Sequence, residues 1–255
     1  IVRLLTGWTC HNVTLAGNYA FWTDGNKGVR ILDLANPASP RWLGLYDRPG
    51  LIMDVAAPEG VGGLALAGSG GAARHYGYMV DSERLWSLDV TNPASAQPAT
   101  SFYLAGRARR LVVAGSTAYV AEETAGTGLE IISVADPLQL QRLGRFTLPG
   151  DSEAHDVAVA GSYAYLLTAS GTATPRTDGR LRVLQVGSPA SPSEVGTYDL
   201  PGDARRIAVA NGVAYVADGA AGLRVIDVRN PAQMVELGHL DPPQAGATTD
   251  VVCVR

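Results

Sequence analysis

Acidic and basic side chains recur in this chain at one point of a repeated unit, where a short apolar run begins. In order along the chain, the residues at this point are Asn12, Asp54, Arg110, Asp156, Arg206 and Asp250. From the second onward, acids and arginines alternate, and one Arg can hydrogen-bond to two carboxylates at once. Two interpretations follow: a ring of salt bridges between repeats, or a polar site that binds an anionic or sugar-like ligand through the arginines.

Histidines precede two of these points, His11 before Asn12 and His155 before Asp156. Imidazole and carboxylate groups are metal ligands, so His155, Asp156, Asp54 and Asp250 could converge on a cation. The arginines between them would place positive charge where the cation would sit, and the chain has no HExxH motif or spaced Cys/His cluster. We therefore predict no metal and no cofactor, and interpret each pair as a loop cap.

Catalytic signatures are weak as well, because no GxSxG nucleophile motif is present. We predict no catalytic residue. The candidate ligand-binding residues are His11, Asn12, Asp54, Arg110, His155, Asp156, Arg206 and Asp250.

The elements that would position these residues are short strands. Residues 201–240 contain four apolar runs separated by Gly, Asp, Asn and Pro, and the first runs of successive units begin 42 to 56 residues apart. Such a period is typical of stacked arrays and propellers. Large and small residues alternate over residues 157–160, which predicts a strand, and no segment shows a capped helical period. Four strands per unit is the content of a propeller blade.

The units also match position by position. The second strand of each carries an aromatic residue: Phe21, Tyr78, Tyr119, Tyr165 and Tyr215. Three residues later stand Asp24, Asp81, Glu122, Thr168 and Asp218. The third strands are predicted to end at Asp33, Asp89, Ser133, Gln185 and Asp227. A turn then follows at Asn36-Pro37, Asn92-Pro93, Asp136-Pro137, Ser188-Pro189 and Asn230-Pro231, where Asn or Asp caps the turn and Pro fixes φ.

The runs DVAVAGSYAYLL (156–167) and GLRVIDVRNPAQMVELG (222–238) resemble the LVIVD-repeat β-propeller family, and the resemblance covers essentially the whole chain. The third and fourth units depart from it, with Ser133 and Gln185 in place of Asp. The resemblance implies a propeller fold and a secreted or surface-exposed bacterial or archaeal protein. It implies no particular reaction.

We therefore predict an all-β protein, a single β-propeller domain of four-stranded antiparallel blades over residues 1–255. The predicted repeats span about 6–46, 47–104, 105–148, 149–200 and 201–240, with a partial repeat at 241–255. Six blades with one incomplete is the interpretation we favour, and five blades is the alternative. A further outer strand is expected at residues 2–5. The chain begins at Ile1 and is interpreted as processed or as a piece of a longer one.

Two units carry insertions, one before Tyr78 that includes Gly60–Gly63 and Gly68–Gly71, and one over residues 170–179. Each is either a Gly/Ser/Thr-rich loop or a lid over a ligand. The chain has only two cysteines, Cys10 and Cys253. They are expected about five residues apart along neighbouring strands, roughly 16 Å, which is too far for a disulfide. We expect two free thiols.

Composition excludes some classes of function. The net charge is −4, so no basic field for nucleic acid is expected, and the apolar runs are too short to span a membrane. We expect a non-catalytic, secreted or cell-surface scaffold that binds protein or glycan. The alternative is a hydrolase or lyase that acts on a sugar or lactone in the channel.

Overall fold

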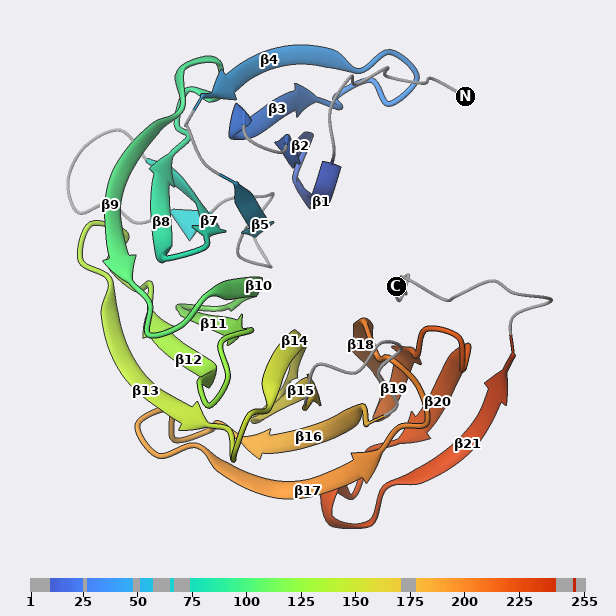
Figure 1. Ribbon diagram of the computed structural model, residues 1–255. Helices are drawn as coiled ribbons and strands as arrows, with labels where there is room; N and C mark the ends of the chain where they lie inside the picture. Colours follow the sequence, from blue (N-terminus) through green and yellow to red (C-terminus); the bar gives the residue numbers. More distant parts are fainter. Residues whose placement is uncertain are drawn as a thin grey trace. The chain divides into compact units, whose positions relative to one another are not determined.

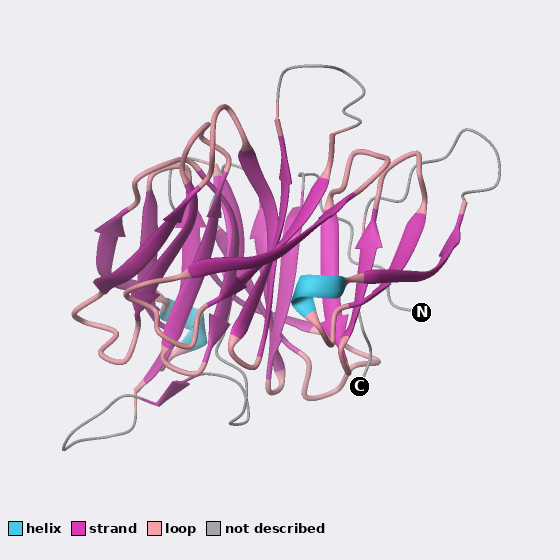
Figure 2. Cartoon of the chain, turned by 90° about the horizontal axis from the view of Figure 1, so that it is seen from below, coloured by secondary structure: helices cyan, strands magenta, loops and turns pink. Residues whose placement is uncertain are grey.

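The computed structural model describes residues 10–24, 27–47, 51–56, 65–66, 74–170, 178–241 and 250 (Figure 1). These residues form five antiparallel sheets whose four main strands follow one another in chain order. Apart from short 3₁₀ turns, the described residues contain no helix (Figure 2). None of the described segments is a helix long and apolar enough to cross a membrane. The predicted all-β propeller fold is confirmed.

Each sheet is one blade. Blade one contains β1 (Cys10–Ala16), β2 (Tyr19–Asp24), β3 (Val29–Asp33) and β4 (Arg41–Tyr46). Blade two contains β5 (Ile52–Ala56), β7 (His75–Asp81), β8 (Arg84–Asp89) and β9 (Gln97–Tyr103), with the short β6 (Ala65–Leu66) paired to β7. Blade three contains β10 (Ala108–Ala114), β11 (Thr117–Glu122), β12 (Gly128–Ser133) and β13 (Gln141–Thr147). Blade four contains β14 (Glu153–Ala160), β15 (Tyr163–Ala169), β16 (Arg180–Gln185) and β17 (Ser193–Asp199). Blade five contains β18 (Arg206–Ala210), β19 (Val213–Ala217), β20 (Leu223–Asp227) and β21 (Val235–Leu240).

The described residues thus form five blades, the number in the alternative interpretation. Of the incomplete sixth repeat only Asp241 and Asp250 are described. The predicted strand at residues 2–5, most of both insertions and Cys253 lie outside the described residues. The prediction of free thiols therefore stays a prediction.

Contacts divide the chain into two compact units, residues 1–119 with 132–142, and residues 120–131 with 143–255. The division passes through blade three. Each unit is described by itself, and the prediction of a single domain stays a prediction.

The turn chemistry read from the sequence is present. The Asn92 side chain accepts a hydrogen bond from the Ala94 amide at 3.2 Å and caps the 3₁₀ turn η2 (Pro93–Ser95). Asn230 does the same for η3 (Pro231–Gln233). In the Asp218-Gly219 turn, Gly219 has a φ of 57°, a conformation that glycine adopts without steric cost. The turns capped by Asn92 and Asn230 follow the third strands of blades two and five and lead into their outer strands.

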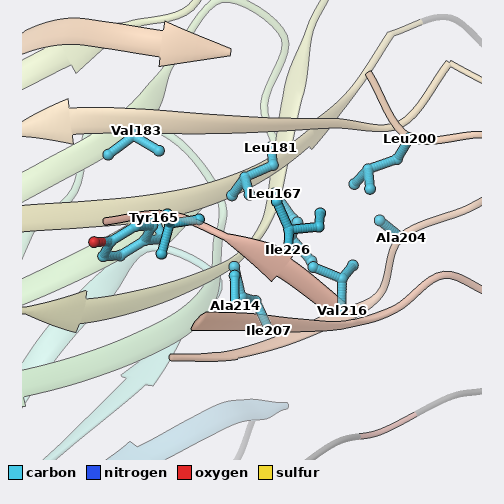
Figure 3. Close-up of a cluster of buried hydrophobic side chains, with 11 residues drawn as sticks. Tyr165, Leu167, Leu181, Val183, Leu200, Ala204, Ile207, Ala214, Val216 and Ile226 are labelled. Atoms are coloured by element: carbon cyan, nitrogen blue, oxygen red, sulfur yellow. The ribbon is translucent and has the colours of Figure 1, made fainter. Parts of the chain in front are cut away.

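The hydrophobic core lies between the faces of neighbouring blades. Figure 3 shows such a cluster, in which Tyr165, Leu181 and Val183 of blade four pack against Ile207 and Ile226 of blade five. A similar cluster joins blades one and two. The blade faces that meet in these two clusters are therefore buried, which explains the apolar residues on the strands that form them.

Glycines on the outer strands let the blades approach closely. Gly196 on β17 sits against the η3 turn of blade five, where an added Cβ would lie 1.8 Å from the Pro231 carbonyl oxygen. At Gly44 on β4 the corresponding atom is the Pro93 oxygen, at 2.5 Å, and at Gly144 on β13 it is the Pro189 oxygen, at 2.0 Å. At these three joints the turn of one blade is therefore seated on the glycine of the blade before it, whereas the outer strand of blade two, β9, contains no glycine.

Candidate functional site

The predicted site residues lie at one edge of each blade, which we call the entry edge. Here the first strand begins, the second ends, the third begins and the outer strand ends. In blade four, for example, Ala154 pairs with Thr168, and Arg180 pairs with both Thr168 and Asp199. The residue that starts the first strand therefore lies beside the turn that links the second and third strands.

Asp54 lies in β5 and is fully buried. Its Oδ1 accepts hydrogen bonds from its neighbour's amide, Val55 N at 2.8 Å, and from the Asn12 side chain of blade one. Its Oδ2 accepts from Leu111 N of blade three at 2.7 Å. Burial raises the pKa of Asp54, while Arg110 and the Leu111 amide act in the opposite direction. The carboxylate therefore links the first strands of three successive blades.

Asp156 repeats this arrangement in blade four. It is buried, its Oδ1 accepts from Val157 N at 2.9 Å, and its Oδ2 accepts from Ile207 N of blade five at 2.8 Å. The acid at this point thus satisfies one main-chain amide of its own strand and one of the next blade. Buried amides need such acceptors, so a structural role for this position follows directly.

The arginines at the equivalent point pair with acids. Arg110 Nη1 lies 3.5 Å from Asp54 Oδ2, and Arg206 Nε lies 3.7 Å from Asp250 Oδ1. Both arginine side chains are about one quarter exposed, and Asp250 is largely exposed. These pairs are two elements of the predicted salt-bridge ring. The complete ring would involve both units and stays a prediction.

The histidines belong to their first strands. His155 is buried at a bulge of β14, between residues paired with Thr168 and Leu167. His11 lies within β1, and its side chain is outside the described residues. In the described part of the chain, no group of three or more His, Cys, Asp or Glu side chains is placed to hold a metal ion.

A second polar column at the entry edge joins the second strand to the third. In blade one, Asp24 hydrogen-bonds and ion-pairs with Arg30. In blade two, Asp81 accepts from Trp86 Nε1 at 2.8 Å. Blade three carries Glu122 and Glu130 at these positions, and both are buried. Each blade thus has one such residue at the end of its second strand and one on its third strand, and the residue on the second strand is an acid in four of the five blades.

In blade five, the arginine of this pair contacts more than one carboxylate. Arg224 lies 3.9 Å from the buried Asp218 and 3.5 Å from Glu236 of the outer strand. Asp218 also accepts from Gly202 N at 3.1 Å. Burial raises the pKa of Asp218 to about 6, against the lowering effects of Gly202 N and Arg224. One arginine therefore has carboxylates on both flanking strands.

Blade four departs from this pattern and opens a pocket of ≈ 280 Å³ at its entry edge. Arg182 Nε bonds to Thr168 Oγ1 at 3.2 Å, and Arg182 Nη1 bonds to Glu194 at 2.7 Å. The Arg182 side chain is only 8% exposed. The polar side chains that line the pocket are Thr168, Ser170, Asp178, Arg180, Arg182 and Asp199.

Sequence reasoning did not find this pocket. The sequence analysis placed Thr168 in one column with Asp24 and Asp218, but it did not connect Thr168 to an arginine on the next strand. The signal was available, because Arg30, Arg182 and Arg224 occupy equivalent positions, each paired with the residue two before Asp24, Thr168 or Asp218.

A family model described as the LVIVD repeat matches residues 9–48, 105–147, 151–171 and 201–241. These segments together make up more than half of the chain. A comparison with curated proteins gives no match.

Solved structures share the fold at low sequence identity. The β-propeller domain of Cps50 (Swd1) from Myceliophthora thermophila is 11% identical with a TM-score of 0.63, over 92% of this chain and 73% of that one. A Lactobacillus plantarum protein is 11% identical with a TM-score of 0.69, over 91% and 70%. PorZ, a bacterial surface component of the type-IX secretion system of Porphyromonas gingivalis, is 16% identical with a TM-score of 0.56, over 93% of this chain and 26% of PorZ.

Proposed function

Because the chain belongs to the LVIVD repeat family of β-propellers, we propose that it is a non-catalytic binding scaffold that takes up a protein or a glycan at the entry edge of its blades. The observation that supports this proposal is that the polar groups at that edge have two different roles. The buried acids Asp54 and Asp156 hold main-chain amides of successive blades, whereas blade four presents an open polar pocket.

The burial of these acids favours binding over acid–base catalysis. A catalytic carboxylate must be within reach of its substrate. Asp54 and Asp156 are at most 1% exposed, and each carboxylate oxygen accepts a hydrogen bond from a main-chain amide. These carboxylate oxygens therefore bind main-chain amides of the protein itself.

The proposed location is the cell surface or the exterior. The family resemblance supports it, as does the likeness of the fold to PorZ, which is itself a surface component. Protease treatment of intact cells of the source organism tests this location. A surface protein is degraded under these conditions, whereas an internal one is protected.

Direct binding measurements test the function. The whole chain is screened against an array of neutral and acidic glycans, and hits are confirmed by isothermal titration. We expect saturable, stoichiometric binding without chemical change of the glycan. The same glycans and a set of sugar lactones are incubated with the protein and analysed by mass spectrometry. Turnover would favour the hydrolase or lyase alternative, and absence of any specific glycan or purified protein ligand would contradict the scaffold proposal.

A further inference from the structure

Blades four and five provide an internal comparison, because both lie in the same unit. Arg182 on β16 and Arg224 on β20 are equivalent, and so are Glu194 on β17 and Glu236 on β21. The arginine contacts this glutamate in both blades, with N–O distances of 2.7 Å and 3.5 Å. The blades differ in the remaining partners. Arg224 also lies 3.9 Å from Asp241, whereas the equivalent Asp199 in blade four pairs with Arg180, and the third partner, on the second strand, differs as well.

That third partner is an acid in blade five and a hydroxyl in blade four. Asp218 lies 3.9 Å from Arg224, while Thr168 stands at the equivalent point beside Arg182. A threonine side chain is shorter in reach than a carboxylate and carries no charge. Blade four therefore retains the arginine and the outer glutamate but lacks one carboxylate of the set.

The pocket lies where this carboxylate is missing. Thr168 and Arg182 both line it, with the start of β16 and the end of β17. Two of the guanidinium N–H groups of Arg182 are used by Thr168 and Glu194. An Arg guanidinium has five such groups, so donors remain for an incoming anion.

We propose that this pocket binds a sugar acid, with the carboxylate of the ligand at Arg182 in the position that Asp218 holds in blade five. This inference rests on the proposed binding function and names its ligand class. The pocket volume of ≈ 280 Å³ is at the lower end for small-molecule sites and suits one sugar residue.

The rest of the lining favours a sugar acid over an acidic peptide. Asp199 pairs with Arg180 at 2.6 Å, and Asp178 accepts from Ser170 N at 2.9 Å. Carboxylates at the rim can accept hydrogen bonds from the hydroxyl groups of a sugar. They would repel the additional negative charges of an acidic peptide.

The test compares galacturonate, a single sugar residue with one carboxylate, with its methyl ester by isothermal titration on the whole chain. The two ligands share their hydroxyl groups and differ in charge. We expect the acid to bind at least tenfold more tightly, because a hydrogen bond to a charged group is stronger than one to a neutral group. This comparison needs no variant.

Thr168→Asp then restores the set of blade five within blade four. We expect it to weaken galacturonate binding at least tenfold while the melting temperature is maintained. Thr124→Asp is the control, because it adds the same charge at an exposed position of the β11–β12 turn. It should leave the affinity unchanged.

The outcomes separate this inference from the proposed function. Equal affinity for acid and ester, or equal affinity of native protein and Thr168→Asp, would overturn the sugar-acid site, even if a neutral glycan binds elsewhere. Tighter binding of a hexaglutamate peptide than of galacturonate would overturn it in favour of an acidic peptide. Absence of binding to all glycans and proteins tested would contradict the proposed function itself.

Discussion

Gly196 on β17 and Gly238 on β21 occupy the same position of blades four and five, but their surroundings differ. Gly196 pairs with Val183 and Gly238 with Val225, and each glycine directly follows the bulge of its outer strand. An added Cβ at Gly196 would lie 1.8 Å from the Pro231 oxygen, whereas among the described residues nothing lies within 4 Å of one at Gly238. Alanine at these two positions therefore tests the seat of the turn.

The expected effects have opposite signs. An ordinary contact of a Cβ is about 3.4 Å or more, and the atom met at Gly196 belongs to the main chain and cannot rotate away. Gly196→Ala must therefore displace the η3 turn, and overpacking of this kind costs up to about 3 kcal/mol. Gly238→Ala restricts the unfolded chain without a clash, which stabilises by about 0.4–1 kcal/mol.

Thermal and urea unfolding, followed by tryptophan fluorescence, measure both variants. For a chain of this size, about 1 kcal/mol corresponds to about 2–4 °C in melting temperature. With a cost of about 1–3 kcal/mol, we expect Gly196→Ala to melt roughly 2–12 °C below the native protein, and Gly238→Ala to melt at or slightly above it.

Two results would refute the reasoning. If Gly196→Ala melts like the native protein, the turn is not seated as described. If Gly238→Ala loses as much stability as Gly196→Ala, the position on β21 is covered as closely as that on β17, and the contrast between the blades is wrong.

Two carboxylates give further predictions. Asp156→Ala removes the acceptor of two main-chain amides, Val157 N and Ile207 N, and should cost about 1–3 kcal/mol for each buried donor left unpaired, measured by urea unfolding; Asp156→Asn, which keeps one acceptor oxygen, should lose less, and equal losses would argue against these bonds. Burial raises the pKa of Asp218 from 3.8 to about 6, so between these values the native state binds its proton more tightly than the unfolded state does. This group therefore lowers the free energy of unfolding as pH rises from about 4 to 6, by about 1–3 kcal/mol. Asp218→Asn should remove this contribution and melt higher than the native protein at pH 7.5; the same pH profile in both proteins would show that Asp218 does not titrate in this way.

The repeat made the strands predictable. The third strands were predicted to end at Asp33, Asp89 and Asp227, and β3, β8 and β20 end there. An Asx-Pro turn follows each of them and stops the strand at a fixed position. Aromatic residues such as Tyr78 and Tyr165 were placed correctly in the second strands. These signals are local in sequence, so no tertiary information was needed.

The roles of the acids were less accessible. The sequence predicted that Asp54 and Asp156 belong either to a salt-bridge ring or to a ligand site, whereas in the structure each accepts a hydrogen bond from a main-chain amide of the next blade. Every residue except proline has a main-chain amide, so the sequence does not indicate which amide a carboxylate will bind. The pocket of blade four depends on Thr168, Arg182 and Glu194, which come from three different strands, and on the absence of an acid at the first of them.

The seating of a turn on the preceding outer strand, present after blades one, three and four, has a consequence for how such chains can grow. A repeat such as blade four contains both parts of the joint, a glycine on its outer strand (Gly196) and a Ser-Pro turn before that strand (Ser188-Pro189). A duplicated gene segment of this length would bring both parts with it. Repeats of this kind could therefore be gained or lost without new interface residues, and each new copy would be free to change its acid column, where blade four already has Thr168 in place of an acid.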